Sequence, residues 1–186
     1  MKAQITETTI QQFVAKVSDH QSAMTGAVLV TSAAQAVALG EACVQISLDN
    51  QVDRLNWHEV SRRIEKIART KENLLHWLDE EMKAIAEHAS YLEGNQLFNQ
   101  QRLCESCVEV SRACITVIKL LAEFRGSAFN RVVDDLEMTI NLLIDLADTA
   151  TALLDKKLQN TLYKNLIEEY QAVRDELKQE LRLFRF

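Results

Sequence analysis

Apolar residues recur at spacings of three and four along most of the chain, which is the pattern of amphipathic helices. One such stripe follows residues 57–91, and two more follow one another between residues 130 and 185. Their apolar positions are Val60, Ile64, Ile67, Leu74, Leu75, Leu78, Met82 and Ile85, then Leu136, Ile140, Leu143, Ala147, Ala150, Leu154 and Leu158, and last Leu166, Tyr170, Val173, Leu177, Leu181 and Phe184.

Capping residues and polar breaks divide this pattern into six predicted helices. Thr8 or Thr9, with Gln11 or Gln12 in the third helical position, can cap the first helix. Asn56 followed by Glu59 indicates the start of the third. We expect helices from the Thr8–Thr9 cap to about Asp19, at residues 27–48, 57–91 and 98–124, and a fifth and a sixth helix that are separated at Gln159–Thr161.

Two of these helices have distinctive surfaces. Residues 27–48 are rich in Ala, Ser, Thr and Gly, so this helix can approach its neighbours closely and is expected in the middle of a bundle. Residues 168–182 are highly charged and carry a narrow apolar stripe. That stripe is typical of an outer helix or of a helix that faces a partner, and both alternatives stay open.

The composition supports a wholly helical protein. The chain has 186 residues, no proline and four glycines, and both residue types are unfavourable inside helices. We therefore predict an all-α fold, a single up-down-type bundle of about six helices, several of them long, with residues 1–186 forming one domain.

The charge argues against nucleic acid as a partner. The formal net charge is −6, from 27 acidic and 21 basic residues, whereas nucleic-acid-binding domains usually present a basic face. The densest basic cluster, Arg62, Arg63 and Lys66, is interleaved with Glu59 and Glu65. We interpret it as a solvated helix face of mixed charge.

No segment has the pattern of a signal peptide or a membrane span. The longest weakly polar stretch, residues 23–38, is interrupted by polar residues and too short to cross a bilayer. We expect a soluble cytoplasmic protein without a membrane partner.

The four cysteines lie on apolar stretches. Cys104 and Cys107 form a C-x-x-C, and together with Cys114 they share one helix face. A zinc site needs two further ligands at matching spacing, and a redox motif needs a βαβ setting. Buried free thiols, with Cys43 as the fourth, are the favoured interpretation. We expect no metal.

Three segments resemble one known family. Ser22–Leu29 reads Ser-Ala-Met-Thr-Gly-Ala-Val-Leu, where that family has Ser-Pro-Thr-Pro-Gly-Gly-Gly-Ser. Trp77–Ile85 is similar to its Leu-Ile-Asp-x-Asp-Ser-x-Ala-Phe helix, and Arg131–Leu136 is similar to its Val-Ser-Asp-Val segment. On these residues the chain resembles the cyclodeaminase/cyclohydrolase family, which includes formiminotetrahydrofolate cyclodeaminase and methenyltetrahydrofolate cyclohydrolase.

The resemblance implies a homodimeric helical bundle whose folate sites involve the subunit interface. It implies hydrolysis or deamination of a one-carbon tetrahydrofolate, with a carboxylate to move protons and with no metal or covalently bound cofactor. A tetrahydrofolate derivative would be the substrate. Carried over by position, the catalytic residues are Asp79 and Asp135, and the substrate-binding residues are Ser22, Gly26, Glu81 and Asp134.

The same residues have simpler interpretations. Asp79 and Glu81 are two apart and do not share a helix face, so they also fit an ordinary polar surface. Asp135 also fits a helix N-cap.

Several family positions are replaced. Ala27, Val28 and Leu29 stand for the last three residues of the glycine loop, and two asparagines of an Asn-Val-x-x-Asn-Leu signature correspond to Leu153 and Lys157. Three functions therefore stay open: a folate cyclodeaminase or cyclohydrolase, a catalytically inactive dimeric relative that binds a small molecule or a protein, and a helical interaction module.

Overall fold

The computed structural model describes residues 9–18, 25–51, 56–89 and 96–184, with only the backbone of residues 81–89 and 96–99. Within these ranges it consists of six α-helices and two short 3-10 turns, and it contains no strand. The helices are α1 (Ile10–Ser18), α2 (Thr25–Asn50), α3 (Trp57–Ala89), α4 (Gln96–Phe124), α5 (Val133–Asn160) and α6 (Lys164–Arg182). The predicted all-α fold is confirmed.

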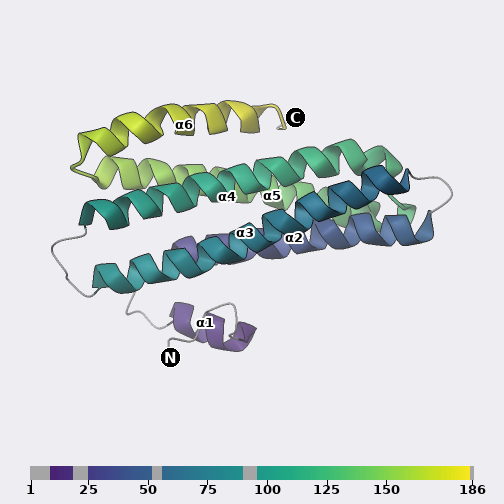
Figure 1. The fold of residues 1–186 in the computed structure, drawn as a ribbon, viewed down its shortest axis with the longest axis horizontal. Coiled ribbons are helices and arrows are strands. Elements are labelled where there is room, and N and C mark those ends of the chain that lie inside the picture. Colours follow the sequence, from purple (N-terminus) through teal and green to yellow (C-terminus); the bar gives the residue numbers. More distant parts are fainter. Residues whose placement is uncertain (1–8, 19–24, 52–55, 90–95, 185–186) are drawn as a thin grey trace.

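Helices α2 to α5 form an up-down bundle in which each helix runs antiparallel to the next (Figure 1). Helix α2 contacts α3 and α5, and α4 contacts α3 and α5, so the four helices close a ring around one core. Helix α6 covers α4 and α5 from outside, and α1 lies on the opposite side of the molecule (Figure 1). The connections are short, as expected for antiparallel neighbours.

Helix α2 is the central helix that its small residues predict. It contacts α3, α4 and α5, and half of its residues are buried. At Gly40 a Cβ atom would lie 2.8 Å from Cδ1 of Leu121 on α4 and 3.4 Å from Cγ2 of Thr139 on α5. The absence of a side chain at Gly40 therefore helps the three helices to approach closely here, since an added Cβ atom would force the end of the Leu121 side chain to shift.

Length and composition alone would allow α2 to cross a membrane, and among the described helices it alone meets this test. However, 56% of its most apolar window is buried inside the bundle. Core helices of soluble proteins have the same character, so this is weak evidence for a membrane span.

The sequence predicted the main helix boundaries because capping residues mark them. The Thr9 N–H donates to Oε1 of Gln12 at 2.9 Å and the Gln12 N–H donates to Oγ1 of Thr9 at 3.2 Å, which is a reciprocal capping box. The Glu59 N–H donates to Oδ1 of Asn56 at 3.4 Å at the start of α3. The predicted break between α5 and α6 is confirmed at Thr161, whose backbone is extended.

Helix α1 buries little of its apolar stripe. Phe13 and Val17 pack against the core, but Ile10 and Val14 are 74% and 56% exposed. Only two of these four apolar residues of α1 therefore face its own bundle.

Helix α6 is the outer helix of its own bundle. Its apolar stripe, Leu166, Tyr170, Leu177 and Leu181, is buried. An ion pair also joins α6 to α4, because Nζ of Lys119 donates to Oε1 of Glu180 at 2.5 Å. The alternative in which this stripe faces a partner is wrong.

Candidate functional site

A pocket lies at the end of the bundle where α4 begins and α5 ends. We call it the bundle-end pocket. It has a volume of about 290 Å³ and is lined by Gln100, Leu103, Cys104, Leu153, Lys156, Lys157, Asn160 and Thr161. Oγ1 of Thr161 donates to Oε1 of Gln100 at 2.5 Å, which joins the first turns of α4 to the end of α5.

The pocket combines an apolar wall with a cationic rim. Leu103, Leu153 and the buried Cys104 supply the wall, whereas Lys156 is exposed and Lys157 is half-buried. Few polar groups on a mostly apolar surface are typical of small-molecule sites. The arrangement suits an apolar ligand that carries a negative charge.

The bundle-end pocket includes two positions that the sequence singled out. Leu153 and Lys157 correspond to the asparagines of the family-like signature, and both line the pocket. They lie one helical turn apart on α5, so they present their side chains to the same space. Leucine and lysine at these two positions therefore form part of the wall of the pocket.

Asp79 lies on α3 near the same end of the bundle. Its side chain is half-buried. The next residue, Glu80, forms an ion pair with Arg102 of α4. Arg102 directly precedes Leu103 and Cys104, which line the pocket. The ion pair joins α3 to α4 at this end of the bundle, but Asp79 itself is not among the residues that line the pocket.

The described part of the segment that replaces the glycine loop, from Thr25 on, is helical. Helix α2 begins at Thr25, and Gly26 is buried in its first turn. Leu29 is 5% exposed and belongs to the hydrophobic core, whereas Val28 is partly exposed. Leu29, which stands where the family motif has its final serine, therefore packs into the core of the bundle.

Two predicted binding residues cannot be placed in the same detail. Ser22 lies outside the described residues, and Glu81 is described by its backbone alone, within α3.

Asp134 and Asp135 lie in the first turn of α5, and both are exposed. The interpretation of Asp135 as an N-cap is wrong, because Val132 occupies the cap position and makes no side-chain cap hydrogen bond. The two carboxylates still stabilise the helix through its dipole. Asp135 also faces α2, since burial first and then its charge raise the pKa of the Cys43 thiol.

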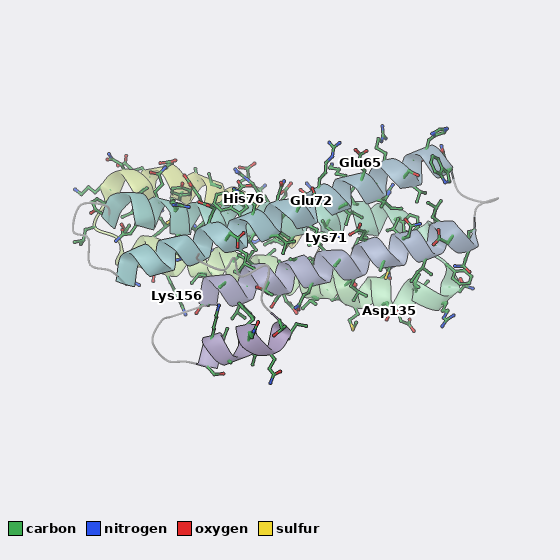
Figure 2. All side chains as sticks on the ribbon, turned by 60° about the horizontal axis from the view of Figure 1, so that its bottom comes forward. Glu65, Lys71, Glu72, His76, Asp135 and Lys156 are labelled. Atoms are coloured by element: carbon green, nitrogen blue, oxygen red, sulfur yellow. The ribbon has the colours of Figure 1, made fainter. Side chains whose placement is uncertain are left out.

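One chain does not bring Asp79 and Asp135 together. Helices α3 and α5 run in the same direction. Asp79 lies roughly six turns into α3, about 33 Å from its first residue at a rise of about 1.5 Å per residue, whereas Asp135 is in the first turn of α5. Figure 2 shows Asp135 in one half of the bundle, and His76, one turn before Asp79, nearer the other end.

The predicted buried thiols are confirmed. Cys43, Cys104, Cys107 and Cys114 are all buried and none forms a disulfide. Burial raises the pKa of the Cys114 thiol to about 12. Among the described side chains, no three of His, Cys, Asp and Glu come close enough together to hold a metal ion.

The comparisons with known proteins decide the family. A family model described as formiminotransferase-cyclodeaminase matches residues 9–155. The chain belongs to this family. The match includes Asp79, Asp134 and Asp135, and half of the residues that line the bundle-end pocket; Lys156, Lys157, Asn160 and Thr161 lie beyond it.

A solved structure of this family has the same fold. The crystal structure of formiminotetrahydrofolate cyclodeaminase from Thermotoga maritima superposes with a TM-score of 0.73 at 14% identity, covering 96% of this chain and 92% of that one. At this identity the likeness shows the shared fold. No curated protein matches the chain.

Sequence reasoning missed the α4 side of the pocket. Gln100, Leu103 and Cys104 lie at spacings of three and four, which does place them on one helix face. Nothing in the sequence, however, indicates that this face meets the end of α5.

Proposed function

We propose that the chain binds a one-carbon tetrahydrofolate at the bundle-end pocket and catalyses its hydrolysis or deamination as a homodimer. The observation that carries the proposal is the bundle-end pocket, which is lined by Leu153 and Lys157 at the positions of the family-like signature. Asp79 does not line the pocket, but it lies at the same end of the bundle on α3, beside the Glu80–Arg102 ion pair. Membership of the formiminotransferase-cyclodeaminase family supports the substrate class.

The residues suggest a division of roles. The apolar wall around Leu103 and Leu153 receives the aromatic part of the folate, and Lys157 at the rim holds a negatively charged group. Asp79 moves protons between the substrate and an attacking water, which is the work that this chemistry requires of a carboxylate.

In this proposal, Asp135 of one subunit contributes to the site that contains Asp79 of the other subunit. Asp135 lies in the first turn of α5, whereas Asp79 lies roughly six turns into α3, which runs in the same direction. Asp135 therefore reaches a site built on Asp79 only from another copy of the chain. A site shared between subunits therefore explains why one chain keeps both carboxylates but does not join them.

A second candidate is a catalytically inactive relative that keeps the bundle and binds a small molecule. The buried Leu29 favours it, because this side chain occupies the place of a glycine-loop residue. The change of both pocket asparagines to Leu153 and Lys157 points the same way.

Thermal melts with a folate series separate these candidates. A ligand at 100 times its Kd stabilises the folded state by about 2.7 kcal/mol. Stabilisation by 5,10-methenyltetrahydrofolate together with loss of its absorbance supports the enzyme. Stabilisation without turnover supports the inactive relative. Neither effect at about 1 mM contradicts folate binding, and a monomer mass in gel filtration contradicts the homodimer.

A further inference from the structure

The beginning of α3 and the end of α4 enclose a second hollow, away from the bundle-end pocket. We call it the basic groove. It has a volume of about 410 Å³ and is lined by Glu59, Arg62, Arg63, Glu65, Lys66, Arg69, Leu120 and Glu123. Its volume falls within the range of about 300–1,000 Å³ that is usual for small-molecule sites.

The three carboxylates of the groove are already engaged by two of its four cations. Arg63 contacts Glu59 and Glu123, each at 3.4 Å, and Arg69 contacts Glu65 at 2.5 Å. Figure 2 shows Glu65 on the outer side of α3. These pairs account for every carboxylate that lines the groove.

Arg63 also forms a fixed part of the floor. It donates to the backbone oxygen of Leu120, and its guanidinium carbon lies 5.9 Å from the centre of the Phe124 ring. Its side chain is only 11% exposed. Arg63 therefore holds α3 against α4 and keeps the shape of the groove.

The remaining cations, Arg62 and Lys66, have no carboxylate partner in the described part of the chain. Both are exposed, and they lie four residues apart, so their side chains are neighbours on one helix face. Lys66 is also three residues from Arg69. Like charges at these spacings destabilise a helix, and such a local conflict is expected where a residue serves a function.

We propose that the basic groove binds a small molecule that carries a phosphate or carboxylate group, held between Arg62 and Lys66 above Leu120. Two cations one turn apart can contact one oxyanion from both sides, and hydrogen bonds between charged groups are the strong ones. The apolar side of the ligand packs on Leu120. This site is independent of the proposed folate chemistry.

Titration calorimetry with pyrophosphate and with citrate tests this site. The measurement is made at about 0.15 M salt, where the Debye length is about 8 Å and diffuse attraction is largely screened. We expect one of the two probes to bind with saturation at one per chain, and the better probe tells phosphate from carboxylate. Failure of both probes to saturate below about 10 mM overturns the proposal.

The variant Arg62→Gln/Lys66→Gln removes the two unpaired cations. Both side chains are exposed, so the fold is retained, which circular dichroism checks. We expect at least a tenfold weaker Kd. The control Arg131→Gln/Lys164→Gln removes the same charge from exposed positions outside the groove and should leave the Kd within twofold. Equal weakening in both variants overturns the proposal, because it indicates a response to net charge.

Discussion

The hydroxyl of Ser47 on α2 accepts the backbone N–H of Phe129 at 3.0 Å. The same hydroxyl donates to the backbone oxygen of Cys43 at 2.8 Å, and Ser47 is fully buried. One side chain thus fastens the segment between α4 and α5 to the centre of the bundle. It thereby sets where α5 begins, and with it the positions of Asp134 and Asp135.

Replacing Ser47 should therefore weaken the fold. In Ser47→Ala the Phe129 N–H, which is partly buried, loses its partner. A fully buried donor left unsatisfied costs about 1–3 kcal/mol, so we expect a loss toward the lower end of this range. Urea denaturation measures the change. Thr70→Ala is the matched control, since that hydroxyl bonds only to Lys66 of its own helix. Equal losses in the two variants would contradict the role of Ser47 as a link between helices.

The contact between Gly40 and Leu121 predicts a steric limit on α2. Gly40→Val should destabilise the protein by about 1–3 kcal/mol, because added atoms in a packed core force neighbours to move. Leu121→Ala should recover part of this loss in the double variant. A Cβ atom at Gly126 would meet nothing within 4 Å, so Gly126→Ala should change stability little. Additive effects of Gly40→Val and Leu121→Ala would show that the two residues do not compete for space.

Asp155 predicts a pH-dependent contribution to stability. Burial alone would raise the pKa of this carboxyl, but the hydrogen bonds and charges of Lys178 and Arg174 outweigh it and hold the pKa below its usual value. Because the pKa of Asp155 is lower in the folded than in the unfolded chain, its ionised carboxylate stabilises the folded state. This stabilisation is complete above the unfolded pKa of about 3.9, and it is lost as the pH falls through the pKa of the folded state.

Asp155→Asn should accordingly cost about 1–2 kcal/mol at pH 7, and the difference from the natural protein should shrink below about pH 4. Urea denaturation at pH 7 and pH 3 measures it. Asp145→Asn, at an exposed position of the same helix, is the control and should show almost no effect. A cost for Asp155→Asn that is unchanged at pH 3 would contradict the electrostatic account.

The buried thiols predict low reactivity in the folded protein. The thiolate is the reactive form of cysteine. Because the pKa of the Cys114 thiol is about 12, only about one in ten thousand of these thiols is ionised at pH 8. We expect Cys114 to react with a disulfide reagent only on unfolding. Cys104, which lines the bundle-end pocket, should be modified before it. Peptide mapping after timed labelling checks the order, and early labelling of Cys114 would contradict its burial.

The sequence predicts the helices well because their signals are local. The absence of proline, the Thr9–Gln12 capping box and the break at Thr161 act within a few residues. The bundle-end pocket depends instead on the meeting of residues 100–104 with residues 153–161, which periodicity does not encode. The motif comparison likewise selects Asp79 and Asp135 together, but the parallel course of α3 and α5 separates them.

The most direct test of the proposed function is the turnover of 5,10-methenyltetrahydrofolate, followed by loss of its absorbance, for the natural chain and for Asp79→Asn. Asp145→Asn is the control for the loss of one carboxylate on an exposed helix face. Proton transfer by a positioned side chain contributes about 10²–10⁴-fold to a rate. We predict that Asp79→Asn lowers kcat by at least 100-fold with a thermal midpoint close to that of the natural chain, while Asp145→Asn keeps full activity. Equal turnover by Asp79→Asn and the natural chain, or no turnover by the natural chain, would contradict the account.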